Sequence, residues 1–133
     1  MPSPPPRSAA TARPVVRTAR LTGWGRIAPT VARLAEPASP AEVANLLHAA
    51  PGRGVIARGL GRSYNNAAQN DGGLVISTVA LNKIIALDRE SGLATCEAGV
   101  SLEQLMVAGL PAGWFVPVSP EIGRASCRER VCT

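Results

Sequence analysis

Two stretches of the chain carry apolar residues at helical spacing. In the first, the apolar face consists of Val43, Leu46 and Leu47, at i, i+3 and i+4. Ser39 is expected to cap this helix, Pro40 suits its first position, and Glu42 completes a capping box. Because a proline and a glycine follow, the helix should end near Ala50.

The second helical stretch begins after Ser101, which is expected to be its N-cap, with Gln104 completing a capping box. Its buried stripe is predicted to consist of Leu102, Leu105, Met106 and Leu110. The segment 111–113, Pro-Ala-Gly, should end the helix, and residues 114–118 are expected to be extended.

Short apolar runs bounded by turn residues predict strands at residues 55–57, 74–77, 84–87 and 93–97. The turn at 88–92 joins the last two runs into a β-hairpin. Nearer the N-terminus, residues 21–26 are predicted to form a loop anchored by Trp24, and Val31 and Leu34 to lead into a connector. Two capped helices among several short strands indicate an α+β fold.

The strand at 55–57 runs directly into the most distinctive stretch of the chain. Gly59 and Gly61 leave space for a ligand beside the backbone and reach dihedral angles closed to other residues. Successive N–H groups in such a turn form an anion-binding concavity, and Arg58 and Arg62 add positive charge beside it. We interpret this stretch as a cradle for a phosphate or pyrophosphate.

The glycine pattern taken alone is weakly specific. The third glycine of the dinucleotide-binding fingerprint is missing, and no Gly-Lys-Ser/Thr follows as in a Walker loop. A Gly-rich loop with solvated arginines is therefore the alternative interpretation. No catalytic constellation accompanies the loop, because Ser63 has no His or Asp at a telling spacing and Asp88 and Glu90 belong to the hairpin turn.

Composition and charge narrow the classes of function. The 133 residues suffice for one domain, and the formal net charge is +5. Six arginines precede the first acid, Glu36, and the Pro/Arg-rich residues 1–17 are expected to be a disordered extension. A basic nucleic-acid binder is an alternative, but Lys83 is the sole lysine and aromatics make up 3%, so we expect no nucleic-acid partner.

Metal, disulfide and membrane signals are weak. Cys96, Cys127 and Cys132 form no C-x-x-C motif, and His48 has no metal-ligand spacing to them. Cys96 is expected to be an inert buried thiol in a strand. No apolar run has transmembrane length and no signal peptide is visible, so a cytoplasmic or membrane-peripheral location is expected.

Several separated motifs support a family resemblance. They are A-R-G-L-G-R-S-Y at 57–64, A-Q-N-D-G-G-L-V-I at 68–76 and A-G-V-S-L-E-Q-L-M at 98–106. Together they resemble the FAD-binding domain of the vanillyl-alcohol oxidase and p-cresol methylhydroxylase family. L-T-G-W-G-R at 21–26 and W-F-V-P-V-S-P at 114–120 narrow the resemblance to flavin oxidases of a polyprenyl-phosphate ribose.

In that family the Gly-Leu-Gly-Arg-Ser turn wraps the pyrophosphate of FAD, mostly through backbone donors. The resemblance implies FAD contacts from Ala57, Arg58, Gly59, Leu60, Gly61, Arg62, Ser63, Tyr64, Asn65, Asn66 and Ala67. Asn65 and Asn66 depart from the family's Gly-Asp at these positions. Because Asn tolerates positive φ, we expect Asn65 to keep the turn, whereas the lost acid puts the contact of Asn66 in doubt.

The resemblance implies an FAD-dependent oxidoreductase that acts on a CH–OH group. Its reaction would oxidise the 2′-hydroxyl of decaprenylphosphoryl-ribose, in cell-wall arabinan synthesis, by hydride transfer to FAD. A partner reductase would then complete an epimerisation, and peripheral membrane association is possible for such a substrate. A stand-alone nucleotide-binding module is the alternative function.

The family pattern stops after Pro120, where a Gly-Gly segment should follow. Residues 121–131 instead resemble the conceptual translation of a sequencing adaptor, with a genuine basic tail as the alternative. We therefore predict an incomplete, N-terminal part of a p-cresol methylhydroxylase-type FAD-binding domain at 18–120, and a non-native tail at 121–133. Without the substrate site the chain is expected to be inactive, and no catalytic residue is assigned.

Overall fold

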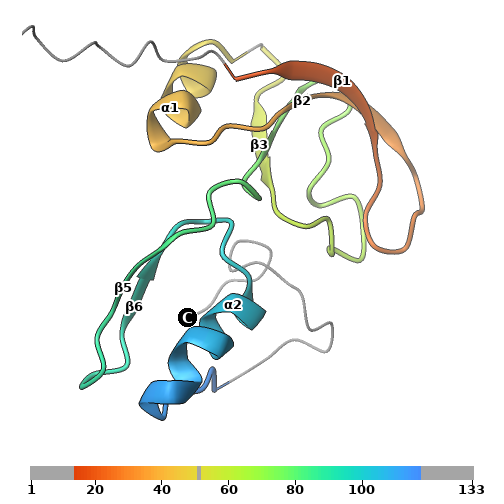
Figure 1. Ribbon diagram of the computed structural model, residues 1–133. Helices are drawn as coiled ribbons and strands as arrows, with labels where there is room; N and C mark the ends of the chain where they lie inside the picture. The colour runs from red at the N-terminus through yellow and green to blue at the C-terminus, as the bar shows by residue number, and fades with distance from the viewer. Residues whose placement is uncertain (1–13, 51, 118–133) are drawn as a thin grey trace, which may run out of the picture.

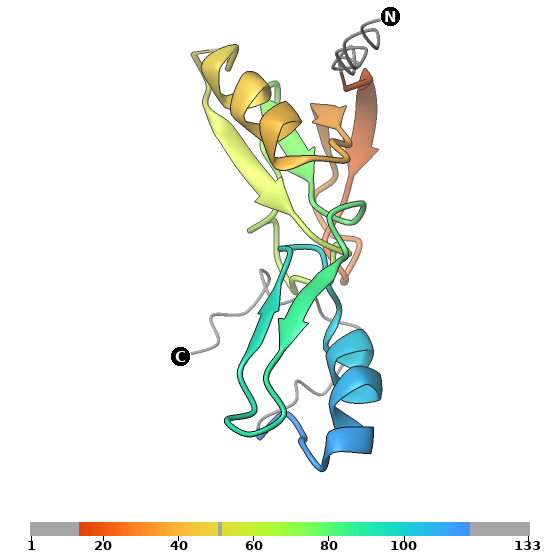
Figure 2. The same cartoon turned by 60° about the vertical axis from the view of Figure 1, so that its left-hand side comes forward.

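The computed structural model describes residues 14–50 and 52–117, which form two lobes (Figure 1). The first lobe contains β1 (Val16–Leu21), β2 (Thr30–Ala35), α1 (Pro40–His48), β3 (Val55–Arg58) and β4 (Leu74–Ser77). The second contains β5 (Ile84–Leu87), β6 (Ala94–Cys96), α2 (Leu102–Gly109) and the 3₁₀ turn η1 (Leu110–Ala112). Figure 2 shows α2 beside the β5–β6 hairpin. The expected α+β fold is confirmed.

The sheet of the first lobe has the order β1-β2-β4-β3. β1 is antiparallel to β2, whereas β2, β4 and β3 run parallel. β4 pairs on both sides and all four of its residues are buried. A strand buried on both faces reads as a continuous apolar run, as Leu74-Val75-Ile76 does.

Side chains alternate between the two faces of this sheet. The face toward α1 carries Ala35, Leu74 and Ile76, with Val55 beside them, and Leu46 and Val43 of α1 pack against this face. The opposite face carries Leu21, Ala32, Leu34 and Val75, with Ala19 and Ile56 packed against them. The same alternation places Arg58, two residues after Ile56, on the face away from α1.

The start of α1 matches the prediction, with one shift. The Ser39 hydroxyl accepts from the Glu42 N–H at 3.3 Å, so Ser39 is the N-cap. The Glu42 carboxylate accepts from the Ala38 N–H at 2.9 Å, one residue before the position that a capping box requires. Leu46 is buried but Leu47 is exposed, so the buried face of α1 is narrower than predicted.

The capping box of α2 is confirmed. The Gln104 N–H donates to the Ser101 hydroxyl at 3.1 Å, and the Ser101 N–H donates to the Gln104 side chain at 2.9 Å. Leu102 is buried, but Leu110 lies in η1 and is exposed, so the predicted stripe was wrong at its C-terminal end. Residues 114–117 follow without strand structure.

The N-terminal strands were missed by the sequence analysis. β1 includes Val16 and Arg17, which the expected disordered extension had covered, and β2 replaces the predicted connector around Val31 and Leu34. β1 buries only its last residue, Leu21, so its sequence carries little alternation. The rest of the extension, residues 1–13, and the predicted non-native tail at 121–133 lie outside the described residues.

The β5–β6 hairpin is confirmed. Trp114, in the segment after α2, contacts the turn of this hairpin. The indole Nε1 donates to the Arg89 carbonyl at 2.9 Å. The ring also lies against Gly92, which has φ +73° and where a β-carbon would approach Cε3 of the indole to 2.6 Å. Gly92 is therefore required both by its backbone angle and by its neighbour.

Gly92→Ala is expected to lower the free energy of unfolding by more than about 1–2 kcal/mol, which is the cost of placing a residue other than glycine at a left-handed backbone angle. The loss should exceed this cost because the indole must also move. Chemical denaturation measures the change. Gly113→Ala is the matched control, since Gly113 has φ +79° with nothing within 4 Å of a β-carbon. Equal losses in the two variants would show that the indole contact does not contribute.

Asp88 shapes the hairpin turn through its carboxylate. The Ser91 hydroxyl, and then the N–H groups of Glu90 and Ser91, donate to it and hold the pKa of Asp88 below its ordinary value. A lowered pKa in the folded state stabilises the turn above the ordinary value, and this stabilisation is lost as the pH falls through the lowered one. We expect Ser91→Ala to raise the Asp88 pKa in an NMR titration; an unchanged pKa would contradict this assignment.

Candidate functional site

The glycine loop leaves the carboxyl end of β3, the edge at which parallel sheets bind their ligands. Of the predicted site residues, Ala57 and Arg58 end the strand and are half-buried, as is Ser63 in the loop. Gly59 and Gly61 are buried. The exposed members are Leu60, Arg62, Tyr64, Asn65, Asn66 and Ala67. The predicted residues therefore form the end of β3 and the loop that follows it.

Gly61 has φ +72°, which explains why this turn needs a glycine. Asn65 was expected to adopt a positive φ in place of the family's glycine, and this expectation was wrong. Among the described residues other than glycine, positive φ occurs at Arg26 and Ala28, not at Asn65. Asn65 therefore follows the turn without the left-handed angle that its replacement of a glycine suggested.

The β1–β2 loop packs against the glycine loop, backbone to backbone. The Trp24 N–H donates to the Ser63 carbonyl at 2.8 Å. At Gly23, a β-carbon would lie 2.7 Å from the Ser63 carbonyl oxygen and would overlap that of Asn65. Trp24 itself is half exposed and meets the Tyr64 ring edge-to-face, with centroids 5.9 Å apart. The sequence predicted a loop anchored by Trp24, and in the structure Trp24 contacts the glycine loop through its N–H and its ring while its side chain stays half exposed.

Gln69 is a buried polar residue that connects the two loops. With its amide oriented to satisfy both ends, Oε1 accepts from the Gly23 N–H at 2.8 Å. Nε2 then donates to the Ala28 carbonyl at 3.1 Å and to the Thr30 hydroxyl at 3.0 Å. Sequence analysis missed Gln69, and its one signal was a long amide side chain in a segment of small residues.

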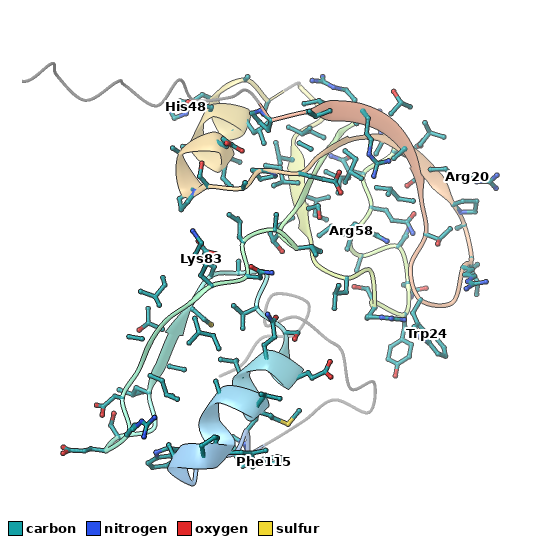
Figure 3. The ribbon with its side chains drawn as sticks, viewed as in Figure 1. Arg20, Trp24, His48, Arg58, Lys83 and Phe115 are labelled. Atoms are coloured by element: carbon teal, nitrogen blue, oxygen red, sulfur yellow. The ribbon has the colours of Figure 1, made fainter. Side chains whose placement is uncertain are left out.

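The two loops and the end of β3 line an open cavity of about 460 Å³. It is lined by Thr22, Gly23, Trp24, Arg26, Arg58, Leu60, Gly61 and Arg62. Figure 3 shows Trp24 at the tip of the β1–β2 loop and Arg58 inside the curve of β1 and β2. Three arginines beside a glycine turn give this cavity a lining whose chemistry suits an anion. The half contributed by residues 22–26 was absent from the predicted site.

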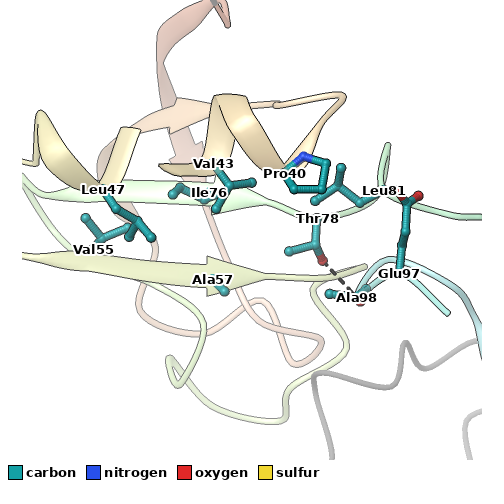
Figure 4. A pocket seen from close by; sticks show the side chains of 10 residues that line it. All are labelled: Pro40, Val43, Leu47, Val55, Ala57, Ile76, Thr78, Leu81, Glu97 and Ala98. Atoms are coloured by element: carbon teal, nitrogen blue, oxygen red, sulfur yellow. Dashed lines mark hydrogen bonds between the residues drawn. The ribbon is translucent and has the colours of Figure 1, made fainter. Parts of the chain in front are cut away.

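A second cavity, of about 390 Å³, lies on the other side of the sheet, beneath α1. Figure 4 shows its apolar lining, in which Val43 and Leu47 of α1 face Val55 and Ile76 of the strands. Its polar members are Thr78 and Glu97. A carboxylate and the lack of a lining arginine make this groove unsuited to a pyrophosphate.

Within residues 14–50 and 52–117, no three His, Cys, Asp or Glu side chains gather to hold a metal ion. None of the helices described there has the length and hydrophobicity to cross a bilayer. Cys96 is a free thiol in β6, half-buried rather than buried as expected. His48 is exposed.

Comparison with known proteins adds a family to this geometry. The model of the FAD binding domain family matches residues 31–127 and thus extends past residue 120, where the predicted partial domain ended. The decaprenylphosphoryl-β-D-ribose oxidase of Mycolicibacterium smegmatis is 54% identical over 106 residues, which cover 77% of this chain and 23% of that protein. An uncharacterised FAD-linked oxidoreductase of Mycobacterium tuberculosis is 40% identical over 89 residues, covering 65% and 19%.

Solved structures agree on the fold. Cholesterol oxidase from Brevibacterium sterolicum superposes with a TM-score of 0.69 at 16% identity, covering 94% of this chain and 24% of that one. A variant of the same oxidase gives a TM-score of 0.69 at 17% identity, covering 94% and 25%. The chain thus spans less than a quarter of the length of the curated relatives that it matches.

Proposed function

Because the chain belongs to the FAD-binding domain family of oxidoreductases, we propose that the cavity between its two loops holds the pyrophosphate of FAD. The observation that carries this proposal is that two glycines at which the backbone is closely packed, Gly23 and Gly61, lie in the same cavity lining as three arginines. Gly61 has positive φ, and neither it nor Gly23 has space for a β-carbon. Because both positions lack a side chain, the β1–β2 loop packs closely on the glycine loop and the Arg58 guanidinium packs on Gly61, and these contacts shape the cavity that the arginines line.

The residues of this chain bind and orient the cofactor. Backbone N–H groups of the glycine loop would donate to the phosphate oxygens, and Arg26 and Arg62, which both line the cavity, would balance the phosphate charge. Bound FAD supplies a hydride acceptor, so the role of this segment is to fix its position.

The relative with 54% identity supports a proposal for the reaction of the whole protein. We propose oxidation of the 2′-hydroxyl of decaprenylphosphoryl-ribose, within cell-wall arabinan synthesis and with a partner reductase. A polyprenyl substrate resides in a membrane, so the proposal includes peripheral membrane association. Since the chain spans 23% of that relative, we expect no oxidase turnover from the 133 residues alone.

Calorimetric titration of the chain with FAD, ADP and adenosine tests the cofactor site. FAD and ADP are expected to bind saturably at one site and to compete with each other, whereas adenosine, which lacks phosphates, should bind far more weakly. Equal affinity for adenosine and ADP would overturn a pyrophosphate cradle. Failure of FAD and ADP alike to bind would remove the proposal for this chain.

Arg62→Gln is expected to lower ADP affinity roughly 10-fold, which corresponds to the loss of about 1.4 kcal/mol of charge-assisted binding. The salt dependence of binding should weaken too, because one screened attraction is gone. Arg20→Gln is the control, since Arg20 is exposed on β1 outside the cavity lining. If the two variants lose the same affinity, general charge rather than the cavity attracts the nucleotide.

A further inference from the structure

The arginine that ends β3 faces the loops. Alternation along β3 puts Val55 and Ala57 in the groove beneath α1, and Ile56 and Arg58 on the opposite face. The Arg58 carbonyl accepts from the Thr78 N–H at 2.8 Å and from the Thr78 hydroxyl at 3.4 Å. The base of this side chain is therefore fixed to the next parallel strand.

The guanidinium of Arg58 donates to two main-chain carbonyls. Nη2 donates to the Thr22 carbonyl at 2.6 Å, and Nη1 donates to the Ala68 carbonyl at 3.0 Å. Thr22 precedes Gly23 in the β1–β2 loop, and Ala68 follows the glycine loop. One side chain thus connects both walls of the cavity to the end of β3. A planar fork suits two such acceptors, whereas an ammonium group does not span them.

The same guanidinium lies against the glycine turn. A β-carbon at Gly61 would overlap Nη2 of Arg58 and lie 2.9 Å from Cζ. Gly61 therefore needs its hydrogen because the guanidinium occupies that space, in addition to its φ of +72°. The turn and the arginine fit each other.

We propose that Arg58 is a positioning residue, which shapes the pyrophosphate cradle by connecting the Thr22 and Ala68 carbonyls beneath Gly61. In its ligand-binding consequence this inference rests on the proposed function. The arginine charge toward the anion then comes from Arg26 and Arg62. This assignment reverses the role that the sequence suggested for Arg58, which was added charge at the phosphate.

Arg58→Lys and Arg58→Gln separate shape from charge. Both are expected to lower ADP affinity at least 10-fold. Arg58→Lys keeps the charge, so its slope of affinity against salt should match that of the wild type, whereas Arg58→Gln removes a cation of the cavity lining and should have a shallower slope. Arg20→Lys is the matched control, because Arg20 is exposed on β1 outside the cavity lining, and it should bind ADP like the wild type. If Arg58→Lys binds like the wild type while Arg58→Gln loses affinity and salt dependence, Arg58 acts as charge and the proposal is wrong.

A double-mutant cycle tests the fit between Arg58 and Gly61. Gly61→Ala should cost at least 10-fold in ADP affinity in the wild-type background and several-fold less in Arg58→Gln, because the overlapping group has gone. Additive losses would contradict a direct fit between the two residues.

Hydrogen exchange gives a readout that does not require a ligand. The Trp24 and Gln69 amides donate to the carbonyls of Ser63 and Asn66, within the two segments that Arg58 connects. We call the two Arg58 hydrogen bonds, to the Thr22 and Ala68 carbonyls, the brace. In Arg58→Lys their exchange should accelerate at least 10-fold, whereas the Leu105 amide of α2 should be unaffected. If wild-type chain binds neither FAD nor ADP, accelerated exchange still supports the brace and only the cofactor proposal fails. Unchanged exchange would overturn the brace.

Discussion

Gly23→Ala is expected to reduce the affinity of the chain for ADP and FAD by well over 10-fold, more than roughly 1.4 kcal/mol. A β-carbon there would lie 2.7 Å from the Ser63 carbonyl oxygen, which belongs to rigid backbone rather than to a yielding side chain. The β1–β2 loop must then move away from the glycine loop, and the 2.8 Å bond from the Trp24 N–H to Ser63 is lost. Titration calorimetry measures the loss.

Gly25→Ala is the matched control for this variant. Gly25 lies two residues further along the same loop, and a β-carbon there would find the Tyr64 carbonyl oxygen at 3.4 Å, an acceptable contact. Binding should therefore change little in Gly25→Ala. If Gly23→Ala binds as well as Gly25→Ala, the close approach of the two loops does not form the site.

Leu74→Ala is expected to lower the free energy of unfolding by about 2–5 kcal/mol, the range for removing a buried leucine. Leu74 is 1% exposed and packs between the sheet and α1, where β4 pairs on both sides. A loss of this size is a large part of the ~5–15 kcal/mol that holds a domain folded, and it should reduce the cooperativity of the first lobe.

Urea denaturation followed by circular dichroism measures this loss. Val31→Ala serves as the control, because Val31 lies on neighbouring β2 with its side chain half exposed. That change should stay within about 0.5 kcal/mol. Comparable losses at the two positions would mean that Leu74 is not part of the central core.

The sequence was most informative where a local rule decides the structure. Ser39 and Ser101 mark the helix starts through capping, which depends on neighbours three residues away. The β5–β6 hairpin follows from two apolar runs and the turn around Asp88. Gly61 marked the turn because a positive φ favours glycine in any fold.

Features decided by tertiary contact were beyond the sequence pattern. β1 is an edge strand that buries only Leu21, so its residues lack the alternation of a half-buried strand. Of the β1–β2 loop residues that line the cavity, Gly23 has only main-chain atoms to contribute, and such atoms give no sequence pattern. The direction of Arg58 depends on carbonyls 36 and 10 residues away.

Because the β1–β2 loop meets the glycine loop through carbonyl oxygens, the contact is largely indifferent to side-chain identity at positions 63 and 65. Every amino acid carries the acceptor that the Trp24 N–H uses at Ser63. Sequence divergence in this part of the loop can therefore proceed while the interface persists, as the Asn65 carbonyl against Gly23 illustrates. The evolutionary constraint falls instead on the β1–β2 loop, where Gly23 has no room for even the methyl group of an alanine.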